Sequence, residues 1–553
     1  MKSRTMRKAL ALSLVSLSIS TMGLALIFAQ GGGEQASQRP IDTQGALLHT
    51  EAGVLGPPIE YIPAYSESIP EVSAAQRDAF KRMDIRRQRG YDALNALLEP
   101  NPDHPVEGPT YHIMANGQLG TDESKLEEAL ADSSLTFFQS SDVQTALFPG
   151  SSVINEPAHA QIGKNVFFTG NWYVAKSTNA GATFSYVSPF ADFPDFCCDQ
   201  DVIHDVSRNL IIWSRQGDVN SAGVNQIKLG VSKNGGATFF IYTWSPTTFD
   251  SSLTNKNFDY PHLALSNDYL YITVNIFNAA DIETNRMMIR LPLQQLAAGT
   301  FSFNRLTLVS GKSIEPVQGA TTTMYFGSNE NSAGTFRVYS WPESTTVVSS
   351  FARTIPAYTF TTKGSATCTV PNGRNPCGRT DDRITDGYVA KGIIGFFWNV
   401  AQGGGFPYPY INAATFRESD LIYLARPYIS SSSNAYQYGA AAPNTRGDLG
   451  VAALAAGGSV GYPQFAISLA DDVSGTVPPW KFFTVAASTN WGLNNDGTEG
   501  AGDYLRARQF SPVGTFWTAS GYYGVGSPVA YKGRFAVFGR GREQPAWNRW
   551  STQ

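Results

Sequence analysis

Half of the histidines in this chain follow an acidic residue by three positions, each time at the start of an apolar run. The chain has six histidines, and the three pairs are Glu156 with His159, Asp201 with His204, and Asp259 with His262. An imidazole held by a carboxylate can act as a general acid or base. Imidazole and carboxylate groups are also ligands for divalent metal ions. The recurring pair therefore marks a candidate site for acid–base or metal chemistry.

Arginine takes the place of histidine at the corresponding positions later in the chain. The arginine-containing sets are Asp382 with Arg383, Arg446 with Asp448, and Asp503 with Arg506. Guanidinium groups hold carboxylates in forked, charge-assisted hydrogen bonds, so three of them could clamp an acidic substrate. Tyr260 and Tyr504 stand beside two of these positions and could complement histidine in proton transfer.

Seven acidic positions of this kind recur at intervals of 45 to 67 residues when Glu315 is included. Between them, short apolar runs such as 209–213 and 269–274 alternate with Gly, Asn, Asp and Ser, which is typical of strands and turns. The interval suits a four-stranded antiparallel sheet with generous loops. We therefore expect an all-β propeller of about seven four-stranded blades, with six as the alternative, whose equivalent positions converge on one ring.

Two segments support this fold by repeating the pattern Ser-x-Asn-x-Gly-x-Thr-Phe. They are 177–184 and 232–239. The Asn and Gly suit a tight hairpin turn, and the hydroxyls suit hydrogen bonds to its backbone. The pattern resembles the Asp-box, or BNR repeat, of sialidase-like β-propellers, with Asn for Asp and Phe for Trp. The resemblance implies a propeller over 135–553. Sialidase activity itself is not expected, because no Phe/Tyr-Arg-Ile-Pro motif lies near the first blade.

The sequence after Asp503 predicts only three of the four strands of the last blade. After Asp503, the runs 505–510, 515–522 and 534–539 predict three strands. The run 135–139 precedes the first blade and can supply the fourth, which would close the ring and remove its exposed edges.

The N-terminal region reads as an export signal followed by an extension. Four basic residues precede the uncharged apolar stretch 9–28, so we expect residues 1–29 to be a signal peptide, with an uncleaved membrane anchor as the alternative. Residues 30–134 are expected to form a linker and a partly helical extension. Helical periodicity covers 73–98, and a second helix is expected over 123–131.

The four cysteines suit an oxidising compartment. Cys368 and Cys377 bracket a turn with two prolines and an Asn-Gly pair, which predicts a small disulfide-closed loop. Cys197 and Cys198 are adjacent in the sequence. They either form a vicinal disulfide or remain a reduced pair.

Charge and composition limit the class of protein and the kinds of partner that we expect. Charged residues make up 16% of the chain and there are 52 glycines, which argues against a coiled coil or a disordered chain. Removal of residues 1–29 would take away four basic residues and lower the formal charge from −4 to −8. A mildly acidic body is a poor polyanion binder, so no nucleic acid partner is expected. We expect a monomer that is secreted or lies at the cell surface or in the periplasm.

The loop 403–410 carries three aromatic residues after three glycines. Phe406, Tyr408 and Tyr410 could stack on sugar rings. The alternative is that they pack against their own blade.

Three interpretations of the expected ring remain open. The acid–histidine and acid–arginine pairs could simply brace neighbouring blades. Glu156, Asp201 and Asp259 could help to hold a divalent metal, which is the candidate cofactor. The histidines, arginines and tyrosines could act on a polysaccharide. The functional hypotheses are a propeller that binds a glycan or another extracellular polymer without catalysis, or a polysaccharide lyase or glycoside hydrolase that acts on an acidic glycan.

Overall fold

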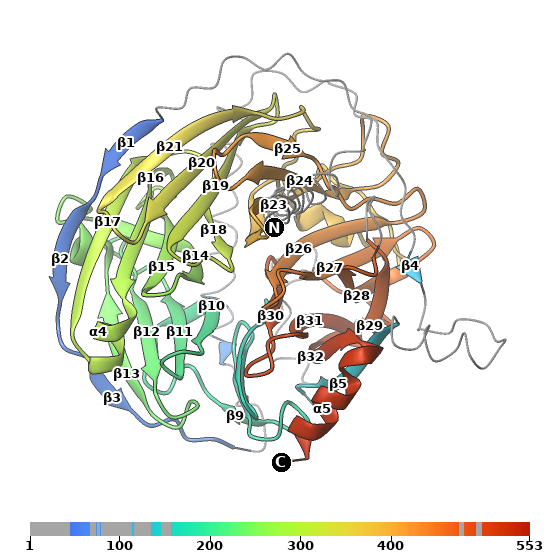
Figure 1. Cartoon of the computed structure of the whole chain (residues 1–553), viewed down its shortest axis with the longest axis horizontal. Helices are drawn as coiled ribbons and strands as arrows, with labels where there is room; N and C mark the ends of the chain where they lie inside the picture. The colour runs from blue at the N-terminus through green and yellow to red at the C-terminus, as the bar shows by residue number, and fades with distance from the viewer. Residues whose placement is uncertain are drawn as a thin grey trace, which may run out of the picture.

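Seven blades of β-strands surround a common axis in the computed structural model (Figure 1). The structure describes residues 45–66, 73–74, 78, 113–114, 134–144, 156–474, 480–493, 500 and 502–552. In the first six blades the innermost strand comes first in the chain, and the next three strands follow outward in order. The predicted all-β propeller is confirmed, with seven blades rather than six.

The first four blades are contiguous in the chain. Blade 1 contains β6 (Ala158–Ile162), β7 (Asn165–Thr169), β8 (Val174–Ser177) and β9 (Ser185–Val187). Blade 2 contains β10 (Phe196–Asp205), β11 (Leu210–Gly217), β12 (Ile227–Ser232) and β13 (Phe239–Trp244). Blade 3 contains β14 (Lys256–Leu265), β15 (Tyr269–Asn278), β16 (Glu283–Pro292) and β17 (Phe301–Val309). Blade 4 contains β18 (Glu315–Gln318), β19 (Thr323–Asn331), β20 (Thr335–Pro342) and β21 (Val347–Thr354).

The remaining blades complete the circle. Blade 5 contains β22 (Ile384–Ala390), β23 (Ile393–Val400), β24 (Tyr410–Arg417) and β25 (Tyr423–Ala425). Blade 6 contains β26 (Ala435–Pro443), β27 (Leu449–Gly457), β28 (Gly461–Ala470) and β29 (Phe482–Ala487). Blade 7 contains β30 (Arg506–Gln509), β31 (Trp517–Val525), β32 (Ala530–Arg540) and β5 (Leu135–Asp142). Blades 4 and 5 share one sheet because the inner strands β18 and β22 pair in parallel.

The ring closes as the sequence predicted. Strand β5 pairs antiparallel with β32, and Phe535 faces Ser141 in that register. The final blade therefore joins a strand from before blade 1 to three strands from the end of the chain. Such closure leaves the last blade without a missing partner strand.

The two Asp-box-like repeats form the β8–β9 and β12–β13 hairpin turns. In the first, the Ser177 hydroxyl accepts a hydrogen bond from the backbone N–H of Gly181 at 2.9 Å, and the Asn179 Oδ1 accepts one from Thr183 at 2.9 Å. The second turn, at Ser232 and Asn234, repeats both bonds at the same distances. These side-chain hydrogen bonds stabilise the turn, where backbone ladder bonds are not formed.

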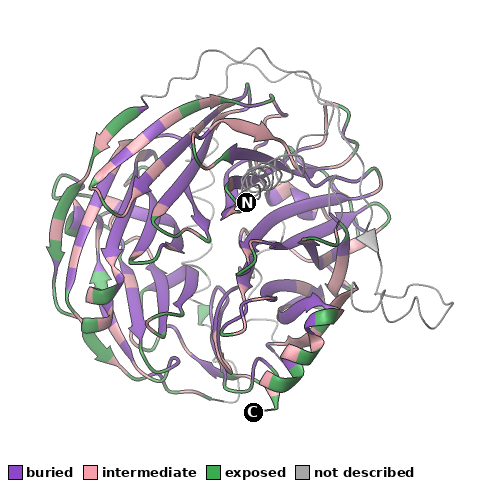
Figure 2. Cartoon of the chain, viewed as in Figure 1, coloured by how far each residue is buried: buried purple, intermediate pink, exposed green. Residues whose placement is uncertain are grey.

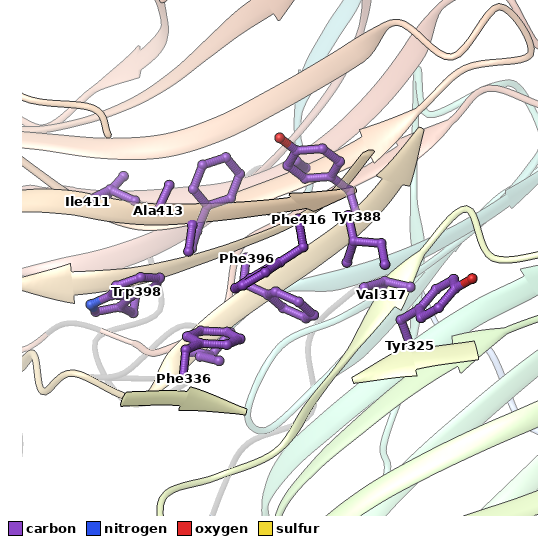
Figure 3. Close-up of a cluster of buried hydrophobic side chains, with 14 of the residues drawn as sticks. Val317, Tyr325, Phe336, Tyr388, Phe396, Trp398, Ile411, Ala413 and Phe416 are labelled. Atoms are coloured by element: carbon purple, nitrogen blue, oxygen red, sulfur yellow. The ribbon is translucent and has the colours of Figure 1, made fainter. Parts of the chain in front are cut away.

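Large aromatic side chains fill the space between blades, as they do between blades 4 and 5 (Figure 3). The Phe396 ring on β23 is fully buried, and it packs at 5.4 Å from Phe336 on β20. A Cβ at Gly327 or Gly387 would lie 2.7 Å from this ring, so only glycine leaves room for it. The buried residues run through the inner and middle strands of the blades, and exposed positions lie toward the outer rim (Figure 2).

The N-terminal segment adds outer strands that the sequence did not predict. The strands β1 (Ala46–His49), β2 (Glu51–Leu55) and β3 (Ile59–Tyr61) pair with the outermost strands of blades 4, 3 and 2. They follow the rim of the propeller one after another (Figure 1). The short strand β4 (Ile113–Met114) extends blade 6. The expectation of a linker and a partly helical extension over 30–134 missed these strands because they depend on hydrogen bonds from existing blade edges rather than on their own periodicity.

Helices are few among the described residues. They are α3 (Pro246–Phe249), α4 (Leu293–Ala298), α5 (Gln544–Ser551) and the 3-10 turns η1 (Pro376–Arg379) and η2 (Gly541–Glu543). Helix α5 packs Trp547 and Trp550 around Phe510 of blade 7. No helix in this described part has the length and apolar character needed to cross a bilayer. The expected signal peptide and nearly all of the expected helices over 73–98 and 123–131 lie outside the described residues.

The packing between blades 4 and 5 predicts a large stability loss for Phe396→Ala. Removal of a fully buried phenylalanine ring leaves a cavity, and such changes cost about 3–5 kcal/mol of unfolding free energy. Urea unfolding followed by tryptophan fluorescence measures the loss. The matched control is Val309→Ala at a position that is 77% exposed, where we expect a change within about 0.5 kcal/mol. Equal losses in the two variants would contradict the assigned interface.

Candidate functional site

The inner strands of four blades carry β-bulges. The ladder register shifts between Phe196 and Gln200 in β10, Asp259 and His262 in β14, Ile384 and Asp386 in β22, and Gln437 and Ala440 in β26. A bulge bends a strand and re-aims a side chain, and bulges are common beside functional sites. Tyr260 and Tyr438 take equivalent places in two of these bulges, with φ of 54° and 57°. Positive φ is uncommon for a residue with a bulky side chain.

Polar residues from six blades gather where the inner strands begin, and we call them the rim cluster. Its members are Glu156, Asp199, Tyr260, Arg379, Asp381, Arg383, Tyr438, Asp503 and Tyr504. The Asp503 side chain is 18% exposed, and the other members are buried. Six of them lie in inner strands or just before them, and the other three lie in the segments that lead into β22 and β30.

Arg383 connects one side of the rim cluster. Its Nε lies 2.9 Å from both carboxylate oxygens of Asp381, and its Nη2 donates to Asp503 Oδ2 at 3.0 Å. The guanidinium also lies 4.3 Å from the centre of the Tyr260 ring. That ring is stacked on Tyr504 with 5.5 Å between centroids. Opposite charges and a cation–π contact therefore already satisfy Arg383.

Glu156 is the buried carboxyl of the rim cluster. Asn171 Nδ2 donates to its Oε2 at 2.6 Å, and the Asp503 backbone N–H donates to its Oε1 at 3.1 Å. Arg379 Nη2 lies 3.6 Å from the same Oε1. Burial, with smaller contributions from the charges of Asp199 and Asp503, raises the pKa of Glu156 to about 8. The carboxyl is therefore mostly protonated at neutral pH.

A second set of charges lies further along the same inner strands, and we call it the axial cluster. Its members are Asp201, His262, Glu315, Asp386, Arg506 and Arg508. Arg506 Nη2 donates to Asp201 Oδ2 at 3.1 Å, and Arg508 Nη2 lies 3.6 Å from Asp201 Oδ1. Burial raises the pKa of Asp386 to about 6, because desolvation outweighs the attraction of the two arginines. Asp201 joins blade 2 to blade 7 through these contacts.

The three predicted histidines are all buried, and none lies in the rim cluster. His159 bonds Ser520 Oγ at 2.9 Å through Nδ1 and Thr518 Oγ1 at 2.7 Å through Nε2. His262 Nδ1 lies 2.9 Å from Glu315 Oε1. Burial is the main cause that lowers the pKa of His204 to about 4, and it lowers the pKa of His159 and of His262 well below the usual value. The contacts of His159 and His262 with neighbouring blades and the burial of all three imidazoles favour the bracing interpretation over acid–base chemistry.

The three arginines that were expected to clamp an acidic substrate do not lie together in the structure. Arg383 lies in the rim cluster and Arg506 in the axial cluster. Arg446 lies in the β26–β27 turn, where it bonds Asp448 at 3.0 Å and Glu543 at 2.7 Å. The prediction that Arg446 occupies a position equivalent to Arg383 and Arg506 was wrong. Arg446 precedes β27, the second strand of its blade, rather than the inner strand β26.

The aromatic loop packs against its own blade. Phe406 stacks on Tyr410 with 3.9 Å between ring centroids, and both side chains are buried. Tyr428 meets both rings edge-on. Tyr408 packs beside the cluster around the Cys368–Cys377 disulfide. The prediction of a sugar-stacking surface is therefore wrong for Phe406 and Tyr410, whose buried rings stack on each other, and it stays a prediction for the half-buried Tyr408.

The predicted metal ligands do not form a shared site. Among the described residues, no three His, Cys, Asp or Glu side chains are grouped to hold a metal ion. Asp201 is engaged by two arginines, and Glu156 is a mostly protonated carboxyl. Asp259 Oδ1 lies 3.4 Å from Gln216 Nε2. A protonated or arginine-paired carboxyl is a poor metal ligand.

Both cysteine pairs form disulfides. Cys197–Cys198 lies in the bulge of β10, directly before Asp199 of the rim cluster. Cys368–Cys377 closes the predicted small loop, which ends at η1 and leads to Arg379. The Asn372 side chain in this loop donates to Asn490 Oδ1 at 2.9 Å and to the Trp491 carbonyl at 2.7 Å. The loop therefore spans from blade 5 to the segment that precedes blade 7.

Sequence reasoning missed five residues of this region. They are Asn171, Asp199, Arg379, Asp381 and Tyr438. Asp199 and Asp381 each lie within two positions of an acid that was identified, so the local acidic pairs were a usable signal. Asn171 lies in the β7–β8 connection of the blade that Glu156 leads into, whereas Arg379 lies before β22 and only the folded ring brings it to Glu156.

Comparison with known proteins found similarity only among solved structures. No family model and no curated protein matches this chain. A Penicillium chrysogenum alpha-L-arabinanase complexed with arabinobiose aligns over 74% of this chain and 99% of its own, with 11% identity and a TM-score of 0.35. The GH93 alpha-L-arabinofuranosidase of Fusarium graminearum, also complexed with arabinobiose, covers 73% and 98%, with 10% identity and a TM-score of 0.36.

A third similar structure is a Trypanosoma rangeli sialidase in complex with sialic acid. It aligns over 61% of this chain and 53% of its own, with 7% identity and a TM-score of 0.33. At such identities and TM-scores, none of the three carries an inference about the chemistry of this chain.

The axial cluster predicts that Asp201→Asn destabilises the protein strongly. The substitution keeps the side-chain shape but leaves two buried guanidinium groups without their shared counter-charge, which typically costs about 3–5 kcal/mol. Urea unfolding measures the effect. Asp268→Asn removes one of the two carboxylate partners of Arg208 at a position that is 65% exposed, so this control should lose less than about 1 kcal/mol. A similar loss in both variants would show that the axial pairing is not structural.

Proposed function

We propose that this protein is a carbohydrate-active enzyme, a glycoside hydrolase that acts on a neutral glycan at the rim cluster. We also propose that it works outside the cytoplasm. The basic and apolar N-terminal segment and the two disulfides support that location. The proposal about chemistry depends on one observation, the buried carboxyl of Glu156 that accepts a hydrogen bond from the backbone of a second acidic residue, Asp503.

Glycoside hydrolysis needs a carboxylic acid that protonates the leaving oxygen and a carboxylate that serves as base or nucleophile. Glu156 suits the first role because its pKa is raised to about 8. Asp503 suits the second role because it is the most exposed member of the rim cluster, and its Oδ2 lies 3.0 Å from Arg383 Nη2. The backbone N–H of Asp503 bonds Glu156, so the two groups are held side by side.

The charges of the rim cluster favour a neutral substrate over an acidic one. The cluster contains four acidic side chains and two arginines. Arg383 is paired with Asp381 and Asp503, and Arg379 lies near Glu156 and Asp503. A uronate or sialate carboxylate entering the cluster would meet these acids without a guanidinium in excess. We therefore propose a neutral glycan in place of the acidic glycan named in the enzymatic alternative of the sequence analysis.

The tyrosines of the cluster suit hydrolysis better than β-elimination. Burial is the largest of the causes that raise the pKa of Tyr260 and of Tyr504 well above the usual value. Both hydroxyls therefore stay protonated at neutral pH and act as hydrogen-bond donors rather than as the base that a lyase requires. Tyr504 donates to Asp199 Oδ2 at 3.2 Å, and Tyr260 donates to the Ile384 carbonyl at 3.3 Å.

The decisive test is a turnover screen with Glu156→Gln. The full mature chain would be assayed for reducing ends on neutral oligosaccharides of arabinose, xylose, glucose, mannose and galactose, and on oligogalacturonate and sialyllactose for comparison. We expect activity on a neutral member of this panel. Glu156→Gln should lower kcat by about 100-fold to 10,000-fold, the usual contribution of a general acid.

Glu283→Gln is the matched control for that variant. Glu283 on β16 is also a buried glutamate whose pKa is raised to about 8, mainly by burial, but it accepts its hydrogen bond from Gly311 outside the rim cluster. It should keep nearly full activity. If the two variants lost activity equally, Glu156 would not be the acid. Binding of a glycan with no product would favour the non-catalytic hypothesis instead.

The pH dependence follows from the same carboxyl. The active form needs the proton on Glu156, so kcat/KM should fall as the pH rises through about 8, where that proton is lost. Rates measured from pH 5 to 10 on the best substrate would locate this fall in kcat/KM. A fall centred near the usual glutamate pKa would contradict the assignment of Glu156 as the proton donor.

A further inference from the structure

Asn171 and Glu156 are joined by two hydrogen bonds. The Glu156 backbone N–H donates to Asn171 Oδ1 at 2.7 Å, and Asn171 Nδ2 donates to Glu156 Oε2 at 2.6 Å. A backbone N–H can only donate, so the first bond fixes which end of the Asn171 amide is the oxygen. The amide nitrogen is also only a donor, so Oε2 of Glu156 has to act as the acceptor. Both residues are buried, with exposed fractions of 1% for Asn171 and 3% for Glu156.

The turn that carries Asn171 is held by the neighbouring blade. Asn171 lies between β7 and β8 of blade 1. On one side of it, Gln200 Nε2 of blade 2 donates to the Gly170 carbonyl. On the other side, Trp172 Nε1 donates to the Cys197 carbonyl at 3.1 Å, in the bulge of β10. These contacts fix the backbone on both sides of Asn171 and so hold its amide against Glu156.

The two carboxyl oxygens of Glu156 have unequal partners. Oε2 accepts the bond of 2.6 Å from Asn171. The groups at Oε1 lie farther away, with the Asp503 backbone N–H at 3.1 Å and Arg379 Nη2 at 3.6 Å. In a protonated carboxyl group the carbonyl oxygen is the stronger acceptor, and the other oxygen carries the proton. The shorter bond therefore assigns the carbonyl to Oε2 and the proton to Oε1, on the side of Asp503.

Several ionisable groups face Glu156 from the surrounding blades. They are Asp199, Arg379, Asp503, Tyr504 and Tyr522. Burial and the two aspartates disfavour the charged form of Glu156, whereas Arg379 favours it. Asn171 acts in the same direction as Arg379, because a hydrogen-bond donor to a carboxylate stabilises the charged form. Loss of that donor would therefore raise the pKa of Glu156 further.

We propose that Asn171 is a positioning residue that holds Glu156 by Oε2, so that Oε1 presents the acid proton on the side of Asp503. This inference rests on the proposed function, because it takes Glu156 as the general acid. In a glycoside hydrolase the acid and the second carboxyl group act on the same glycosidic bond. A proton on Oε1 lies on the side where the two groups meet. Asn171 acts through Glu156 and needs no contact with the substrate.

Infrared difference spectra of the full mature chain test the bond to Oε2 without a substrate. Spectra recorded with and without Glu156→Gln isolate the carbonyl band of the protonated Glu156 carboxyl, in the wild-type protein and in Asn171→Ala. A hydrogen bond to a carbonyl oxygen weakens the C=O bond, so Asn171→Ala should shift the band to higher frequency. The band should also persist to a pH about one to two units higher, because the carboxylate has lost a donor.

Asn225→Ala is the matched control. Asn225 is also buried, and its Oδ1 accepts the Phe258 backbone N–H at 2.7 Å. Its Nδ2 donates to the carbonyls of Gly217 and Phe258, so its contacts match those of Asn171 except for the carboxyl group. This variant should leave the Glu156 band unchanged. A band that kept its frequency and its pH dependence in Asn171→Ala would overturn the inference, as would the absence of the band from the wild-type protein.

Asn171→Asp removes the donor and keeps the acceptor for the Glu156 N–H. Its carboxylate would also attract the Glu156 proton to Oε2. On the best neutral oligosaccharide, kcat should fall about 10-fold to 100-fold, part of the contribution of a general acid, and the fall in kcat/KM should move to higher pH. Asn225→Asp should change neither.

The kinetic outcomes separate this inference from the proposed function. An unchanged kcat and pH profile in Asn171→Asp would overturn the positioning role and leave the proposed function standing. If the wild-type protein hydrolysed no oligosaccharide, the proposed function would fail, and the infrared band alone would then decide whether Asn171 holds the Glu156 carboxyl by Oε2.

Discussion

The inner strands direct ionisable side chains toward a common axis, where little water is left to solvate them. Each charge there has to be balanced by an opposite charge or removed by a shift in protonation. Asp201 meets Arg506 and Arg508, and Lys312 meets Asp382 at 2.6 Å with both side chains fully buried. His159, His204 and His262 respond differently, because burial keeps them neutral. Glu156 lies 3.6 Å from Arg379, but burial outweighs this attraction and raises the pKa of its carboxyl.

The same constraint links the blades to one another. Asp201 of blade 2 bonds residues of blade 7, His159 of blade 1 bonds Ser520 and Thr518 of blade 7, and Arg383 of blade 5 bonds Asp503. Contacts that cross the axis or the gap between blades therefore tie the geometry of the rim cluster to the closure of the ring. Strand β5 secures that closure from the outside.

The fold could be predicted further than the site. The Asp-box-like turns and the spacing of the acidic positions indicate seven blades, because turn chemistry and strand length are local properties of the sequence. Arg446 was misplaced for a physical reason. The inner strand β26 has the sequence Ala-Tyr-Gln-Tyr-Gly-Ala-Ala-Ala-Pro, which lacks the large aliphatic residues that signal a strand, so the alignment fell on the next strand. Asn171, Arg379 and Asp381 come from connecting segments, which carry no strand periodicity, and the approach of Arg379 to Glu156 arises only in the closed ring. His159 and His262 bond residues of neighbouring blades rather than the acids that precede them in the sequence, which favours the bracing interpretation.

The protonation state of Glu156 is the claim on which the proposed chemistry depends, and it can be observed without a substrate. Infrared difference spectra between the wild-type protein and Glu156→Gln isolate the carbonyl stretch of the protonated Glu156 carboxyl. The account predicts that this band is present at pH 7 and disappears as the pH rises through about 8. A band already absent at pH 7 would mean that Glu156 is ionised there, and the general-acid assignment would be wrong.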